Sequence, residues 1–226
     1  MEIPFSPAQR HVDEYRRFRA LLMEMNHKMI KILPKQAYDD IGDAIGIRHQ
    51  DTLIFESEDM ISVLMDCCIY DWFENGKNIV QRYAEAYPAR PGTAENEVLQ
   101  ACLQAKYAIL IAESAVPGAG MYCRDILNGG NLFLMDVSMS HTPVAGRAAL
   151  ATRVLPVNQY WITGGASLPI TSANPDLRYI ETERDKLLRT AGGISLRLIR
   201  SCLAAGAINH IHYQTTPTRK KRRRRR

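Results

Sequence analysis

The sequence lacks the features that mark a membrane or secreted protein. Among its 226 residues, no apolar run approaches the ~20 residues that a membrane-spanning helix needs. The opening stretch is mixed in character and contains Pro4 and Pro7, so it does not resemble a signal peptide. The five cysteines are odd in number. We therefore expect a cytoplasmic protein with reduced thiols and no membrane partner.

Motifs that hold metals, cofactors or nucleophiles are also missing. The sequence contains no CxxC pair, no HExxH and no GxSxG elbow. Its glycine pair Gly118-x-Gly120 lacks the further glycine and the Lys-Ser/Thr of a phosphate loop, which favours a turn. His210 and His212 are the closest histidine pair, and nothing nearby completes a ligand set. These absences predict no catalytic set, no metal and no cofactor.

The adjacent thiols Cys67 and Cys68 lie in an apolar helical context, VLMDCCIYDWF. Free cysteine is among the most buried residue types, and most buried thiols serve packing. We interpret this pair as structural thiols of a helix core, with a redox or metal role as the alternative.

Positive charge is concentrated in one short segment. Of the 29 Lys and Arg residues, eight lie between 219 and 226, so the other 21 face 24 acidic residues and give a formal net of −3. A mildly acidic body has no overall basic field to hold nucleic acid, whereas a block of like charges favours a disordered tail that contacts a polyanion. The candidate polyanion-binding residues are Arg219, Lys220, Lys221, Arg222, Arg223, Arg224, Arg225 and Arg226.

Hydrophobic periodicity predicts an α+β fold. Residues 1–106 show apolar positions at helical spacing and form an N-terminal helical layer. Residues 107–170 alternate in character and are punctuated by glycine turns, which predicts a small antiparallel β-barrel or sheet of about five strands. Residues 171–213 form a C-terminal helical segment, and 214–226 form the basic tail. The expected helices span 9–32, 35–45, 58–74, 78–87, 94–106 and 177–203.

Charged residues within the predicted strands are the most informative polar feature. Asp125, Asp136 and Arg153 each lie in an otherwise apolar strand, as does Glu113. A charge in that position needs an edge, a turn or a partner. We favour an Asp–Arg pair that braces the hairpins. The alternative is a ligand site made by Asp125, Asp136 and Arg153, with Arg153 binding an anion.

The most specific sequence marks resemble a family of uncharacterised bacterial proteins. These marks are Gly118-x-Gly120, Asp125-Ile126-Leu127, Asp136, Gly146 and Ala151-Thr152-Arg153, within a similarity from Tyr15 to Ile170. Some relatives carry a C-terminal SEC-C zinc motif, which this sequence lacks. The resemblance supports the fold and implies no established activity.

Together these observations favour a non-enzymatic cytoplasmic interaction or adaptor protein whose tail contacts a polyanion such as nucleic acid. A small-molecule binder or enzyme that uses the charges of the β region is the alternative. A protein partner docking on the helical layer is a third hypothesis.

Overall fold

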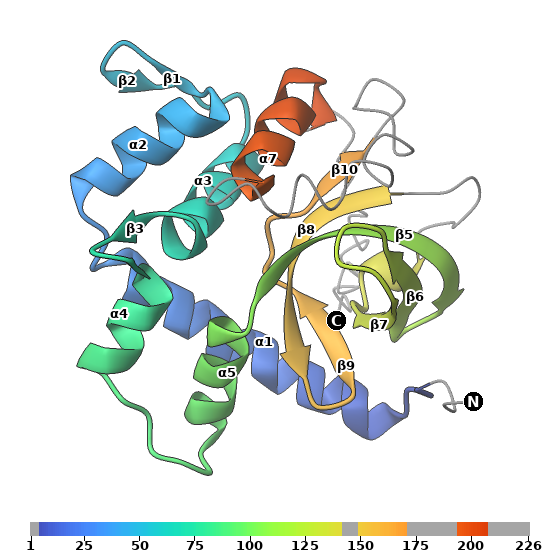
Figure 1. Cartoon of the computed structure of the whole chain (residues 1–226). Coiled ribbons are helices and arrows are strands. Elements are labelled where there is room, and N and C mark those ends of the chain that lie inside the picture. The colour runs from blue at the N-terminus through green and yellow to red at the C-terminus, as the bar shows by residue number, and fades with distance from the viewer. Residues whose placement is uncertain (1–4, 142–148, 171–193, 208–226) are drawn as a thin grey trace, which may run out of the picture.

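A helical layer lies against a small β-barrel (Figure 1). The structure, a computed structural model, describes residues 5–141, 149–170 and 194–207. Among these residues no helix is long and apolar enough to cross a membrane. The α+β architecture predicted from the sequence is confirmed. Its helices are α1 (Gln9–Ile30), α2 (Lys35–Ile45), α3 (Glu58–Tyr70), α4 (Ile79–Ala86), α5 (Ala94–Leu103) and α7 (Ile194–Ala204).

The helix boundaries follow local signals in the sequence. Gly46 ends α2 with φ of 81°, a left-handed conformation that glycine adopts without strain. At the start of α4 the Asn78 side-chain oxygen accepts from the Gln81 backbone N–H, and the Gln81 side-chain oxygen accepts from the Asn78 backbone N–H. Thr93 caps α5 by accepting from the Asn96 backbone N–H.

The predicted helix over 58–74 ends earlier than expected, at Tyr70. The chain then forms a hairpin of β3 (Phe73–Glu74) and β4 (Lys77–Asn78). Its turn residues Asn75 and Gly76 have φ of 55° and 77°, the positive values that a two-residue hairpin turn requires. A second short hairpin, β1 (Arg48–His49) with β2 (Thr52–Leu53), follows α2.

Five strands close the barrel in the order β8-β5-β6-β7-β9, and β9 returns to β8. All neighbours are antiparallel except β7 and β9, which meet in a parallel pair at Leu134 and Trp161. The long strand β8 uses its second half for β9 and its first half for β10. The strands are β5 (Lys106–Val116), β6 (Gly120–Asp125), β7 (Asn131–Met135), β8 (Ala149–Val157), β9 (Tyr160–Thr163) and β10 (Leu168–Ile170).

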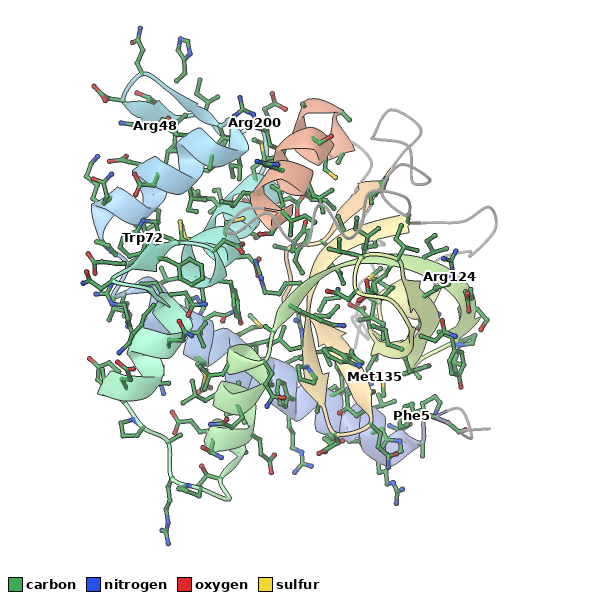
Figure 2. The ribbon with its side chains drawn as sticks, in the orientation of Figure 1. Phe5, Arg48, Trp72, Arg124, Met135 and Arg200 are labelled. Carbon is green, nitrogen blue, oxygen red and sulfur yellow. The ribbon has the colours of Figure 1, made fainter. Side chains whose placement is uncertain are left out.

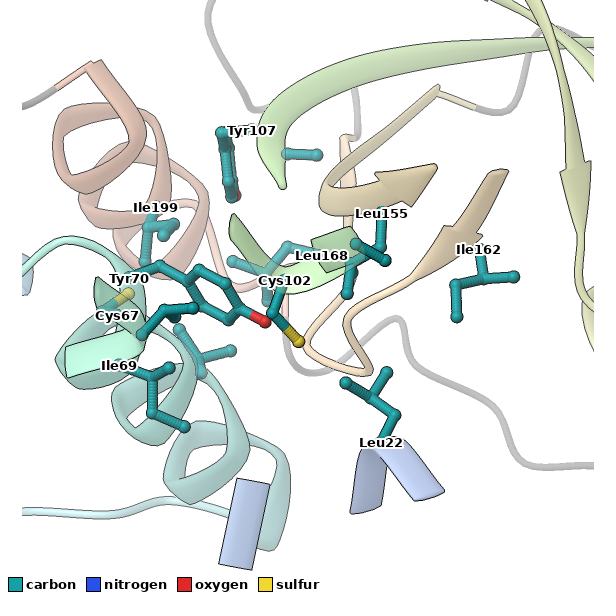
Figure 3. Close-up of a cluster of buried hydrophobic side chains, with 14 of the residues drawn as sticks. Leu22, Cys67, Ile69, Tyr70, Cys102, Tyr107, Leu155, Ile162, Leu168 and Ile199 are labelled. Carbon is teal, nitrogen blue, oxygen red and sulfur yellow. The ribbon is translucent and has the colours of Figure 1, made fainter. Parts of the chain in front are cut away.

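The two faces of the barrel sheet contribute to different cores. Tyr107, Ile109 and Ile111 of β5 belong to the large cluster that continues into the helical layer. Their neighbours Ala108 and Leu110 point to the opposite face and join a smaller cluster. Figure 3 is a close-up of buried hydrophobic side chains of the large cluster, among them Leu22, Tyr70 and Leu155. The smaller cluster consists of Ala108, Leu110, Met121, Cys123, Leu134 and Val154.

Helix α7 packs on α2 and on β10. The sequence predicts a helix over 177–203, and α7 corresponds to the last part of it. Residues 177–193 of that prediction lie outside the described residues. So do residues 208–213 and the predicted basic tail, 214–226.

We expect Gly120→Ala to lower the free energy of unfolding by about 3 kcal/mol, because added bulk in a packed interior forces strands apart. A Cβ at this position would lie 2.0 Å from the Leu134 carbonyl oxygen on β7. Gly118→Ala is the control. That turn residue has φ of 80° and no atom near its Cβ position, so its cost is about 1 kcal/mol from conformation alone. Equal losses in urea denaturation would contradict the close-approach explanation.

Candidate functional site

Arg153 of β8 lies at the junction between the barrel and the helices, with its side chain only 5% exposed. Its Nε donates to Asp66 Oδ2 on α3 at 2.9 Å, and its Nη2 donates to Asp71, the residue that ends α3. Asp71 also accepts a hydrogen bond from Ser195 Oγ of α7 at 2.8 Å. One buried cation therefore joins α3, β8 and α7.

Two aromatic rings surround the guanidinium. Its central carbon lies 4.5 Å from the ring centroid of Tyr70 and 5.6 Å from that of Tyr107, distances at which a cation is attracted to a ring face. Figure 3 shows both tyrosines between the helices and the barrel, with the Tyr70 hydroxyl beside the Cys102 sulfur. The tyrosine rings therefore lie near the guanidinium in addition to the carboxylates that accept its N–H groups.

Gly164, one residue after β9, allows the close approach of these charges. A Cβ added there would lie 3.0 Å from Asp66 Oδ1 and 3.3 Å from the Arg153 Cβ. Its backbone N–H donates to the Arg153 carbonyl oxygen at 2.8 Å. Packing around the ion pair therefore explains the glycine at this position.

Burial and neighbouring charges shift the pKa values of this cluster in opposite directions. Burial alone would lower the pKa of Arg153, but the carboxylates of Asp66 and Asp71 raise that pKa above its ordinary value. Burial raises the pKa of Asp66, and the attraction of Arg153 offsets that rise only in part. An arginine guanidinium keeps its charge at ordinary pH, so a permanent cation faces Asp66 and Asp71 in this cluster.

Within the part of the chain that the structure describes, one group of side chains has the spacing of a metal site. Ligand atoms of Asp66, Cys67 and Asp71 lie within 4.8 Å of one another. The Arg153 guanidinium already bonds both carboxylates, and burial raises the pKa of the Cys67 thiol well above its usual range. A metal would have to displace Arg153 and deprotonate Cys67, so the donor set does not fit a metal.

The structure does not bring the predicted site residues together. Asp125 ends β6 and caps the following turn, accepting from the backbone N–H groups of Leu127 and Asn128 at 3.1 and 3.0 Å. Lys106 Nζ lies 3.3 Å from its other oxygen. Asp136 follows β7 at the opposite end of the β6–β7 ladder and accepts from the Met139 backbone N–H at 2.9 Å.

The residues that sequence reasoning missed are the two partners of Arg153. The sequence favours an Asp–Arg pair that braces the hairpins, whereas the acidic partners of Arg153 come from α3 and its end. A signal for them exists, because Asp66 and Asp71 interrupt an otherwise apolar helical segment. A buried acidic residue needs a cation, and Arg153 is the basic residue in an equally apolar strand.

Comparison with known proteins places the chain in a family. Residues 9–187 match a family of unknown function, DUF7986. The chain belongs to this family. No curated protein and no solved structure matches the chain. The match spans α1 to β10, so the residues that form the Arg153 cluster on α3 and β8 lie within the DUF7986 region.

We expect Arg153→Met to lower the free energy of unfolding by about 4 kcal/mol at neutral pH, since it leaves the buried carboxylate of Asp66 and the half-buried one of Asp71 without a cation. Burial raises the pKa of Asp66 in the folded state. Protonation of Asp66 as the pH falls therefore removes the unpaired negative charge and restores part of the lost stability. The deficit should therefore be larger at pH 8 than at pH 5 in urea denaturation.

Lys106→Met is the matched control for that variant. It removes a cation from Asp125, but Lys106 is 34% exposed and Asp125 keeps its backbone donors. Its cost should be under about 1 kcal/mol. A deficit for Arg153→Met as small as this, or one that does not change with pH, would contradict the buried-charge explanation.

The thiols should be inert in the native protein. Burial raises the pKa of Cys68, Cys102 and Cys123 to about 12 and that of Cys202 to about 11. Since the thiolate is the reactive form, we expect negligible labelling by iodoacetamide at pH 7.5 until urea unfolds the chain, when all five thiols react. Rapid labelling of the native protein, quantified by mass spectrometry, would reveal an accessible thiolate and contradict this expectation.

Proposed function

We propose that this DUF7986 protein is a non-enzymatic, cytoplasmic interaction protein whose basic segment contacts a polyanion such as nucleic acid. The observation that carries the proposal is the run of eight basic residues at 219–226, beside a remainder with a formal net charge of −3. Such a segment gains affinity by releasing the counterions of a phosphate backbone, without reading sequence.

The contacts of the charged residues in the β region support this proposal. Arg153, Asp125 and Asp136 each bind other groups of the protein. The cysteines are buried, and burial raises the pKa of each thiol. The alternative, an enzyme or small-molecule binder built on those β-region charges, would require these contacts to break.

The test compares full-length protein with a variant in which all eight residues of 219–226 are glutamine. We expect the unchanged protein to bind a single-stranded RNA probe with a steep salt dependence. A slope of log K against log salt of about −0.7 per contacted phosphate gives roughly −5 to −6 if every basic residue takes part. The glutamine variant should lose this binding, measured by fluorescence anisotropy across a salt series.

A second variant, in which the arginines of this segment become lysines, controls for charge. Because counterion release depends on charge rather than on guanidinium geometry, this variant should retain the slope. Unchanged RNA binding by the glutamine variant, or no binding by the full-length protein, would overturn the proposal.

A further inference from the structure

A cleft opens where the first turns of α1 meet the β8–β9 turn, at the end of the barrel. Its volume is about 640 Å³, and Arg10, His11, Glu14 and Arg17 contribute to its lining from α1. This volume falls within the range of small-ligand pockets, about 300–1,000 Å³. Its lining includes none of Arg153, Asp66 and Asp71.

The framework of the cleft is fixed by direct contacts. Glu14 accepts from Asn158 Nδ2 at 2.7 Å and from the Tyr160 hydroxyl at 3.0 Å, which ties α1 to the β8–β9 turn. Asn158 has φ of 50°, the left-handed conformation of a tight turn. Both oxygens of Glu14 are therefore occupied by neutral donors.

One wall of the cleft is aromatic. The Phe5 ring centroid lies 5.0 Å from that of His11, 5.2 Å from that of Phe133 and 5.7 Å from that of Tyr160. Figure 2 labels Phe5 where the chain enters α1, beside the barrel. The Phe5 carbonyl accepts the Tyr122 hydroxyl at 2.6 Å, so the backbone of Phe5 is held from β6. A flat ring of a ligand can pack on this wall.

Two arginines supply positive charge at this place. Arg10 and Arg17 are seven positions apart on α1, so they lie on one side of the helix and about 10 Å apart along its axis. Both are exposed. Within the described residues, neither guanidinium forms an ion pair with a carboxylate. Their charge is therefore available to an external anion, in contrast to that of Arg153.

His11, in the cleft, has an N–H donor beside each of its two ring nitrogens, although only one ring nitrogen of a neutral imidazole can accept. Its Nδ1 lies 3.0 Å from the Ala8 backbone nitrogen, and its Nε2 lies 3.2 Å from the Arg10 Nε. Each of these neighbours carries an N–H, but a neutral imidazole has one acceptor nitrogen and one N–H. One of the two contacts therefore joins two N–H groups, so this place offers an N–H to an external acceptor.

We propose that this cleft binds the phosphate of a nucleotide, either free or within a single strand, with the attached ring against the Phe5 wall. Guanidinium groups match phosphate geometry, and a flat ring packs favourably on aromatic side chains. This site is on the folded body and does not depend on the basic segment at 219–226. It goes beyond the proposed function by assigning a ligand class to α1.

The experiment uses the full-length chain with 219–226 changed to glutamine, so that the basic segment contributes nothing. Calorimetric titration with adenosine 5′-monophosphate and with a short oligoadenylate tests the two sources of the phosphate. We expect the double variant Arg10→Gln/Arg17→Gln to weaken binding at least tenfold. Arg16→Gln is the matched control, because this neighbour is exposed, lies outside the cleft and pairs with Asp13 at 3.5 Å. It should change affinity less than twofold.

Cleft-dependent binding of the mononucleotide identifies a free nucleotide as the ligand, and cleft-dependent binding of the oligonucleotide alone identifies a strand. Either result supports the proposal. No binding of either probe, or equal weakening by Arg16→Gln and by the double variant, overturns it. Because these proteins all lack the basic segment's charge, the outcome is independent of whether that segment binds RNA.

Discussion

A guanidinium buried between a barrel and a helical layer is the constraint on which this structure depends. Arg153 cannot lose its charge, so the fold must place anions around it. Asp66 and Asp71 satisfy this requirement from α3 and its end, and Ser195 extends the network to α7. Truncating one partner of such a network is far more costly than the network is stabilising. The ion cluster therefore specifies how the two parts of the molecule dock, while the apolar core provides most of the driving force.

This use of charge has a consequence for function. Asp125, Asp136 and Arg153, which interrupt the strands, each bond to other groups of the protein. A side chain at Gly164 would meet Asp66 and Arg153. Other basic residues are not part of this cluster, among them Arg10 and Arg17 in the cleft at α1 and the run at 219–226 of the sequence. Both of the proposed activities involve anions, and neither uses the Arg153 cluster of this DUF7986 protein.

Much of this architecture follows from local sequence. Glycine turns and alternating strands predict the barrel, and apolar positions at helical spacing predict the helical layer. Pairings between distant segments could not be predicted. Arg153 lies 87 residues from Asp66 and 82 from Asp71, and no local pattern connects them. Asn75-Gly76 indicates the end of a helix, although the same dipeptide also favours the hairpin that forms. The cleft at α1 could not be found from the sequence, because Arg10 and Asn158 become neighbours only when the barrel closes.

The most direct test of the buried ion pair is a double-mutant cycle between Asp66→Asn and Arg153→Met, measured by urea denaturation at pH 7. If the pair joins the helices to the barrel, the double variant should be more stable than the sum of the single effects predicts, with a coupling free energy of about 2 kcal/mol or more. Additive effects, to within about 0.5 kcal/mol, would show that the two residues act independently. That result would contradict the central role of Arg153 in joining the two parts of the molecule.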